Sequence, residues 1–144
     1  MIRRSATAAV AVAAGLACLA APLSSQAAGT AFPTADFEVR YGNTYAVGTV
    51  TFFNRGVTAQ TSARSVDSND CRYVRVEALN AQGHQINDAA YGQSPTVCEG
   101  DVTWAIDVPA DVVGGASSVR VSLMAFDYAT GARKFLVSQR VFPS

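Results

Sequence analysis

The chain has 144 residues, with eleven basic and eleven acidic side chains, and its formal net charge at pH 7 is zero. This length suits one ordinary domain with a core of its own. Arg3 and Arg4 belong to an apolar leader that we expect to be removed, which leaves nine basic against eleven acidic groups. Such a balance attracts neither nucleic acid nor an anionic membrane, so neither is an expected partner.

The N-terminal segment has the three parts of a secretory signal peptide. A basic opening ends at Arg4, an uncharged run covers residues 6–21, and small residues then lead to Ala27 and Ala28. The apolar run falls short of the roughly 20 residues that span a bilayer. We therefore expect a signal peptide over residues 1–27, cleaved after Ala27 or after Ala28, and a secreted, extracellular protein.

Two other export routes stay open. Arg3 and Arg4 resemble a twin-arginine signal, but the apolar pair that strengthens such a signal does not follow them. Cys18 is a candidate for lipidation, although Gly15 stands where lipoprotein signals normally have Leu, and the apolar run continues past the cysteine. A free secreted protein agrees best with this segment.

Alternating apolar and polar residues predict about seven strands after a flexible arm over residues 28–35. In chain order the expected strands are residues 36–41, 44–54, 57–63, 71–79, 101–108, 119–126 and 134–142.

Two of these strands carry further expectations. The strand over residues 44–54 is apolar on both faces, which predicts a central position in a sheet or a bend at Gly48. The strand over residues 101–108 has the most regular alternation, and its expected core-facing side chains are Val102, Trp104, Ile106 and Val108. In the first strand, we expect Phe37, Val39 and Tyr41 to share the buried face.

The connections are less regular. Residues 85–96 are ambiguous, with Ile86 and Tyr91 as their main apolar anchors, and residues 110–113 suggest one short helical turn. Gly and Asn residues mark turns elsewhere, such as Gly42 between the first two strands.

Without the leader, Cys71 and Cys98 form an even pair in an oxidising compartment, where a disulfide is the default. On the chain-entropy account, closing a loop of this length stabilises the fold by about 3–4 kcal/mol. The bond would pin residues 85–97 onto the sheet.

This pattern predicts one all-β domain over residues 36–144. We expect a single antiparallel β-sandwich of about seven strands, immunoglobulin-like or jelly-roll in topology, with one disulfide. Trp104 follows both cysteines in the sequence, whereas antibody-type domains place their tryptophan between the two. Antibody-type kinship is therefore excluded.

Two segments, residues 47–55 (VGTVTFFNR) and residues 71–76 (CRYVRV), together with the leader resemble small secreted bacterial β-sandwich proteins of immunoglobulin-like architecture and unassigned function. The resemblance covers most of the mature chain and rests on strand patterns. It implies a fold and export, and it carries over no functional residue.

The residues show no catalytic constellation, and we expect that the protein is not an enzyme and has no cofactor. His84 is the single histidine and lies in a turn-like segment, and no Gly-x-Ser-x-Gly elbow is present. The acidic residues with a position suited to paired-carboxylate chemistry are expected to be solvated; they are Asp101, Asp107, Asp111 and Asp127.

A metal is not expected either. Asp67, Asn69 and Asp70 supply oxygen ligands in one loop and are a weak calcium candidate. The loop lacks the Gly and the distal Glu of a regular calcium-binding loop, which favours an ordinary polar turn.

Several large side chains fall on strand faces opposite the core. These are Tyr73, Met124 and Phe126, with Tyr128 in the following turn. If they converge, they form an exposed aromatic patch suited to a sugar ring or a protein partner. The alternative is that these strands are covered on both faces.

The sequence thus favours a secreted, non-catalytic binding protein with an unknown protein or glycan partner, and it leaves the oligomeric state open. A second interpretation is an extracellular enzyme inhibitor that presents residues 85–98, or a hydrolase-like effector. A third is a structural protein of the cell envelope or spore surface.

Overall fold

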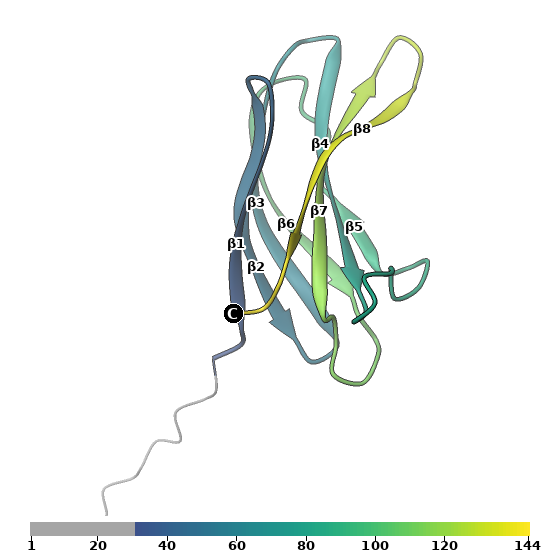
Figure 1. The fold of residues 1–144 in the computed structure, drawn as a ribbon. Coiled ribbons are helices and arrows are strands. Elements are labelled where there is room, and N and C mark those ends of the chain that lie inside the picture. Colours follow the sequence, from purple (N-terminus) through teal and green to yellow (C-terminus); the bar gives the residue numbers. More distant parts are fainter. Residues whose placement is uncertain (1–30) are drawn as a thin grey trace, which may run out of the picture.

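The computed structural model describes residues 31–144, and the expected signal peptide lies outside this range. The described residues form eight strands and no helix (Figure 1). The strands are β1 (Thr34–Tyr41), β2 (Thr44–Phe53), β3 (Gly56–Val66), β4 (Asp70–Leu79), β5 (Tyr91–Gln93), β6 (Glu99–Pro109), β7 (Ser118–Asp127) and β8 (Arg133–Val141). Consequently, no helix in residues 31–144 has the length and apolarity to cross a membrane.

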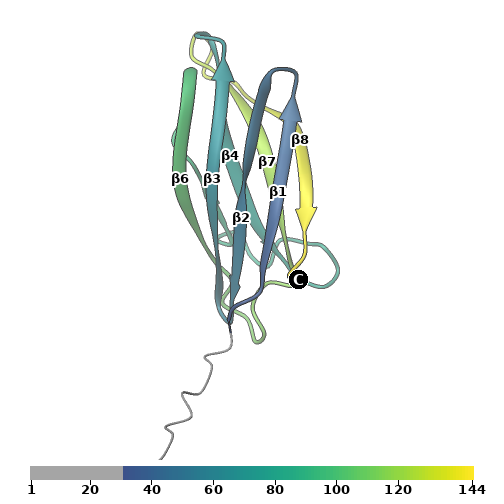
Figure 2. The same ribbon diagram turned by 90° about the vertical axis from the view of Figure 1, so that its left-hand side faces the viewer.

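The strands form two antiparallel four-stranded sheets that pack face to face, which confirms the expected all-β sandwich. The first sheet has the order β1-β2-β3-β6, and Figure 2 views its outer face. The second sheet has the order β5-β4-β7-β8. β1, β2 and β3 form a meander, the chain then crosses to β4, and later β6 returns beside β3 while β7 returns beside β4.

The core lies between the sheets and follows the period-two alternation of the strands. The predicted inner faces of β4 and β7 are confirmed, and their side chains are almost completely buried. The central members of the core are Val50, Val57, Val74, Val76, Val119, Val121 and Leu123.

β3 is longer than the sequence predicts because its inward positions are mostly small or polar. Thr61 and Ser65 are buried, and the Thr61 hydroxyl donates a hydrogen bond to the Trp104 carbonyl over 2.9 Å. A buried hydroxyl with a partner costs little, so the strand continues through residues that look like a loop. β1 likewise begins at Thr34, inside the expected arm.

Two expected core residues are instead half exposed: Tyr41 at 48 % and Trp104 at 49 %. Tyr41 is the last residue of β1 and is followed by the turn at Gly42, where the strand and its packing end. Trp104 lies on β6, which is an edge strand. Across from β6, the short strand β5 approaches closely at Gly92, which lies against Ile106, Asp107 and Val108. Trp104 is left partly uncovered.

The prediction of a helical turn at residues 110–113 is wrong. The connection from β6 to β7 is irregular, and it turns at Gly114 and Gly115 with φ of 84° and 69°. Glycine adopts this left-handed region without a steric penalty, which allows a tight reversal in place of a helix. The ambiguous segment before β6 contains β5, the one strand that the sequence does not predict.

Gly48 is central in the first sheet, as one of the two sequence alternatives predicts. Its strand lies between β1 and β3. A Cβ atom at position 48 would lie 1.9 Å from the carbonyl oxygen of Gln60 and 3.0 Å from Cε1 of Phe37. Only glycine therefore permits this close approach of the neighbouring strand.

Replacing Gly48 by Ala is expected to lower the free energy of unfolding by about 3 kcal/mol, because β2 and β3 must shift apart. Urea denaturation followed by circular dichroism measures the loss. Gly42→Ala is the control: nothing lies within 4 Å of its Cβ position, and only the left-handed φ of 59° is strained, which costs about 1–2 kcal/mol. Equal losses in the two variants would contradict the close-approach argument.

Candidate functional site

The outer face of the second sheet collects large side chains from four strands and one turn. The β4–β7 register sets Tyr73 beside Met124, and the β7–β8 register sets Met124 beside Phe135 and Phe126 beside Arg133. We call this surface the arginine–aromatic face. It comprises Tyr73, Arg75, Glu77, Tyr91, Arg120, Met124, Phe126, Tyr128, Arg133, Phe135 and Arg140.

The four residues of the predicted aromatic patch do lie on this one face. The ring centroids of Phe126 and Tyr128 are 4.8 Å apart in an edge-to-face arrangement. The Arg133 guanidinium carbon lies 5.7 Å from the Tyr73 ring centroid and 5.9 Å from that of Phe126. Tyr73 itself is only 4 % exposed, whereas Tyr128 is 62 % exposed. Tyr73 is thus a floor beneath the patch and not part of its open surface.

A hollow of about 250 Å³ opens at this end of the face. Tyr73, Phe126, Tyr128 and Arg133 line it, and Gln93 and Thr96 complete its wall. Aromatic rings, a guanidinium and amide and hydroxyl groups therefore converge on one open space. Such a mixture is typical of sites that bind a ligand with both apolar and polar surfaces.

A second hollow, of about 420 Å³, lies farther along the same strands. Its charged part is Glu77 between two arginines. Oε1 accepts a hydrogen bond from Nε of Arg75 over 3.1 Å and lies 3.0 Å from Nη2 of the same arginine, and Oε2 accepts from Nη1 of Arg120 over 3.1 Å. The Arg75 guanidinium also stacks over the Tyr91 ring, 4.4 Å from its centroid. One carboxylate between two guanidiniums leaves a net positive charge in the hollow.

The apolar part of this second hollow is formed by Met124 and Phe135, and the hydroxyls of Ser122 and Ser138 lie between the apolar and charged parts. The Phe135 ring is 56 % exposed. The hollow thus offers a charged end, hydroxyl groups and an exposed ring.

The arginines and Phe135 were not predicted from the sequence as site residues. A signal exists for Arg75 and Arg120: each has the outward parity of Tyr73 and Met124 on its own strand. Parity alone does not say which outward residues of different strands are neighbours, because that depends on register. The outward position of Phe135 could not be predicted from alternation, because a β-bulge opposite Leu123 and Met124 shifts the parity of β8.

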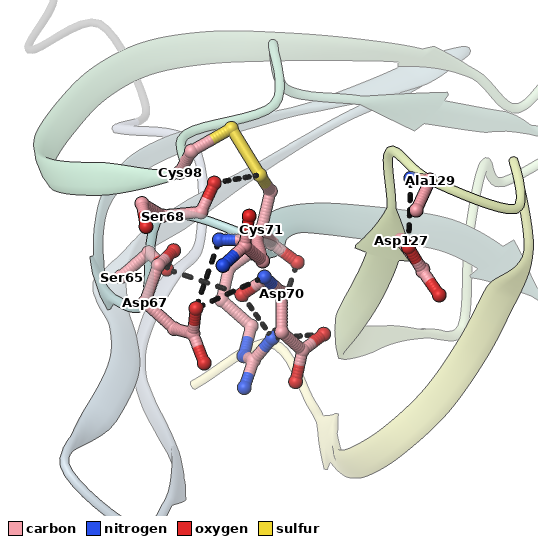
Figure 3. The surroundings of a disulfide bond; sticks show 10 residues. Ser65, Asp67, Ser68, Asp70, Cys71, Cys98, Asp127 and Ala129 are labelled. Atoms are coloured by element: carbon pink, nitrogen blue, oxygen red, sulfur yellow. Dashed lines mark hydrogen bonds and ion pairs between the residues drawn. A yellow bond between two sulfur atoms is a disulfide. The ribbon is translucent and has the colours of Figure 1, made fainter.

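The predicted disulfide is present and borders the face (Figure 3). It joins Cys71 to Cys98 with a Cα–Cα distance of 3.9 Å, and the register sets Cys71 beside Phe126. Next to the bond, the backbones of Arg72 and Val97 exchange two hydrogen bonds of 2.7 and 2.8 Å. The disulfide therefore holds the chain that supplies the Thr96 wall of the first hollow.

The segment between the cysteines is tied down along much of its length, which the sequence did not indicate. Ala78 donates to the Ala90 carbonyl over 2.9 Å, and Ile86 donates to the Ala78 carbonyl over 3.0 Å. Ser94 exchanges hydrogen bonds with the backbone of Val74 through its own amide and hydroxyl. The segment is therefore bonded to β4 at several points, while residues 87–89 between two of them are exposed.

Replacing Cys71 and Cys98 together by Ala is expected to lower the free energy of unfolding by about 3–4 kcal/mol, because the unfolded chain regains the freedom of the closed loop. Urea denaturation measures this. In the folded variant, amide hydrogen exchange should rise at Val97, whose N–H donates to the Arg72 carbonyl, and much less at Ala90, whose neighbourhood is held by backbone bonds to β4. Exchange that rises equally along residues 85–97 would contradict this description.

The calcium candidate loop uses its carboxylates internally (Figure 3). Oδ1 of Asp67 accepts the backbone N–H groups of Asn69 and Asp70 over 2.8 and 3.3 Å. Oδ1 of Asp70 pairs with Nη1 of the buried Arg72 over 2.8 Å. Within residues 31–144 no three His, Cys, Asp or Glu side chains form a group suited to a metal. This geometry favours the polar-turn interpretation.

Hydrogen bonds at two turns lower the pKa of their aspartates. The backbone N–H of Asn69, and then that of Asp70, hold the pKa of Asp67 below its ordinary value of 3.8. The Thr130 hydroxyl, and then the Ala129 N–H, do the same for the pKa of Asp127. The Asp127 turn carries Tyr128, so this cap also positions an exposed ring of the arginine–aromatic face.

These lowered pKa values predict a loss of stability in acid. An aspartate with a folded pKa below its unfolded value stabilises the fold above the unfolded pKa, and this contribution disappears as the pH falls through the folded pKa. We expect the contribution to be complete above about pH 4. Carboxyl NMR titration should give values under 3.8 for Asp67 and Asp127. Asp127→Ala should remove one of the two signals and leave the other unchanged; a value above 3.8 for either group would contradict the described turns.

The remaining candidates for catalysis each contact a different partner. His84 is in a turn, where its backbone N–H donates to Oδ1 of Asn80 over 3.0 Å. Asp107 accepts from the Thr58 hydroxyl over 2.6 Å, and Asp111 pairs with Arg55. Asp101 lies opposite Arg64 on the outer face of the first sheet. Each of these carboxylates therefore makes its own surface contact, and none is described as paired with another carboxylate.

Comparison of the chain with protein-family models, with curated proteins and with solved structures finds no match. The function is therefore inferred from the residues of the arginine–aromatic face and their geometry.

Proposed function

We propose that the chain is a secreted, non-catalytic binding protein and that the arginine–aromatic face holds a glycan ligand. The observation that carries this proposal is the convergence of aromatic rings and arginines around two hollows on one side of the sandwich. Monomeric domains seldom expose such a cluster of large side chains without a partner.

Secretion is supported by two features. The leader has the pattern of a signal peptide, and the Cys71–Cys98 disulfide belongs to an oxidising compartment. Immunoglobulin-like topology and a bacterial origin stay predictions from the sequence.

The shape and chemistry of the face support a glycan over other ligands. The residues Tyr91, Tyr128 and Phe135 are 42 %, 62 % and 56 % exposed. A sugar presents apolar C–H groups that pack on such rings and hydroxyls that bind neighbouring Ser and Arg side chains. The inhibitor interpretation has less support, because backbone hydrogen bonds to β4 hold residues 85–98 at several points.

Replacing Tyr128 or Phe135 by Ala is expected to weaken glycan binding by about tenfold each, because an exposed ring at a binding surface commonly contributes more than 1 kcal/mol. The measurement uses the secreted protein on an array of neutral, amino-sugar and acidic polysaccharides, followed by calorimetry on those that bind. Tyr41→Ala is the matched control, since Tyr41 is 48 % exposed on the first sheet. Binding that is lost equally in the control, or unchanged in both face variants, would reject this surface.

A further inference from the structure

We infer that the ligand is an acidic glycan, a sugar polymer with carboxylate groups, and that Arg75 and Arg120 receive one of those carboxylates. This inference rests on the proposed function and specifies the chemistry of the ligand. It follows from the charge of the face, from the way in which two arginines are held, and from the spacing of the positive charges along the strands.

The charge of the arginine–aromatic face differs from that of the rest of the chain. Residues 31–144 carry nine basic and eleven acidic side chains. Four of the nine basic groups lie on this face against one acidic group, Glu77. The outer face of the first sheet has the opposite balance: Arg40 and Arg64 against Asp36, Glu38, Asp101 and Asp107. Anionic ligands are therefore attracted to one side of the sandwich only.

Arg75 and Arg120 are held in place before any ligand arrives. Glu77 bonds both of them and is only 13 % exposed, while the two arginine side chains are 34 % and 43 % exposed. Tyr91 supports Arg75 from one side. A guanidinium has five N–H donors, so each arginine keeps donors beyond those that Glu77 uses.

These free donors and the unbalanced positive charge suit a carboxylate. Guanidinium groups bind carboxylates through paired, charge-assisted hydrogen bonds. Because Glu77 and Tyr91 already restrict the side chains, little conformational entropy is lost when the ligand binds. Ser122 and Ser138 line the same hollow and supply hydroxyls for the sugar.

The spacing of the charges favours a polymer over a small acid. Arg133 lies beside Phe126, and Arg120 is six residues from Phe126 along β7, a separation of about 20 Å in an extended strand. Met124 and Phe135 lie between these positions. A chain of acidic sugars has a charge for each end and ring faces for the apolar middle, whereas an uninterrupted run of acidic amino acids has the charges without apolar ring faces.

The test compares uronic acid oligomers with their methyl esters, which keep the sugar backbone and remove the charge. The panel contains galacturonate, mannuronate and glucuronate-containing oligomers, and calorimetry measures binding to the full secreted protein. We expect at least one acid to bind at least about tenfold more tightly than its ester, with an affinity that falls as the salt concentration rises.

Three variants separate the residues. Arg120→Gln is expected to weaken binding of the acid about tenfold and to leave binding of the ester unchanged. Glu77→Gln should weaken binding of the acid less than Arg120→Gln does, because it loosens the two arginines that Glu77 holds but removes neither positive charge. Arg64→Gln is the control on the opposite face and should have no effect. Circular dichroism and thermal unfolding show whether each variant is folded.

The outcomes that overturn the inference are distinct from those that overturn the proposed function. Equal binding of acids and esters, or binding confined to neutral glycans, rejects the acidic ligand and leaves glycan binding intact. Poly-L-glutamate that binds as tightly as the best acid shows that the face receives an acidic peptide and rejects a glycan. If no polysaccharide binds at all, both the inference and the proposed function fail.

Discussion

The antiparallel register between β4 and β7 is the constraint on which both the core and the candidate site depend. It sets Val74 beside Leu123 on the inner side and Glu77 beside Arg120 on the outer side. Strand side chains alternate between faces with a period of two, so a slip by one residue would exchange core and surface. The buried valines and leucines enforce the register, and the charged and aromatic pairs outside are aligned as a consequence.

The two edges of the second sheet are covered by different parts of the chain. On the β8 side, the first sheet lies close by, and the N–H of Glu38 donates to Oε1 of Gln139 over 3.0 Å. On the β4 side, β5 has only three residues, and the disulfide fastens the chain that follows it. Because β5 is so short, Trp104 is left half exposed. The chain that follows β5 provides a wall for the hollow above Tyr73.

Much of the fold is predictable from the sequence, because alternation is a local property. It located the inner faces of β4 and β7 correctly, where Val and Leu make the period clear. It underestimated β3, whose inner side contains Thr61 and Ser65, and it missed β5, which is too short to show a period. It misplaced Trp104, because alternation states which way a side chain points but not whether another element covers it.

The sequence by itself determined the all-β class, the disulfide between Cys71 and Cys98, and the outward position of Tyr73, Met124 and Phe126, because these follow from cysteine pairing and strand periodicity. Only the tertiary structure decided which outward residues of β4, β7 and β8 meet, because register and the bulge in β8 arise from contacts between distant segments. It thereby joined arginines from three strands with the aromatic rings, and it decided that Tyr73 lies beneath the surface that Tyr128 and Phe135 expose.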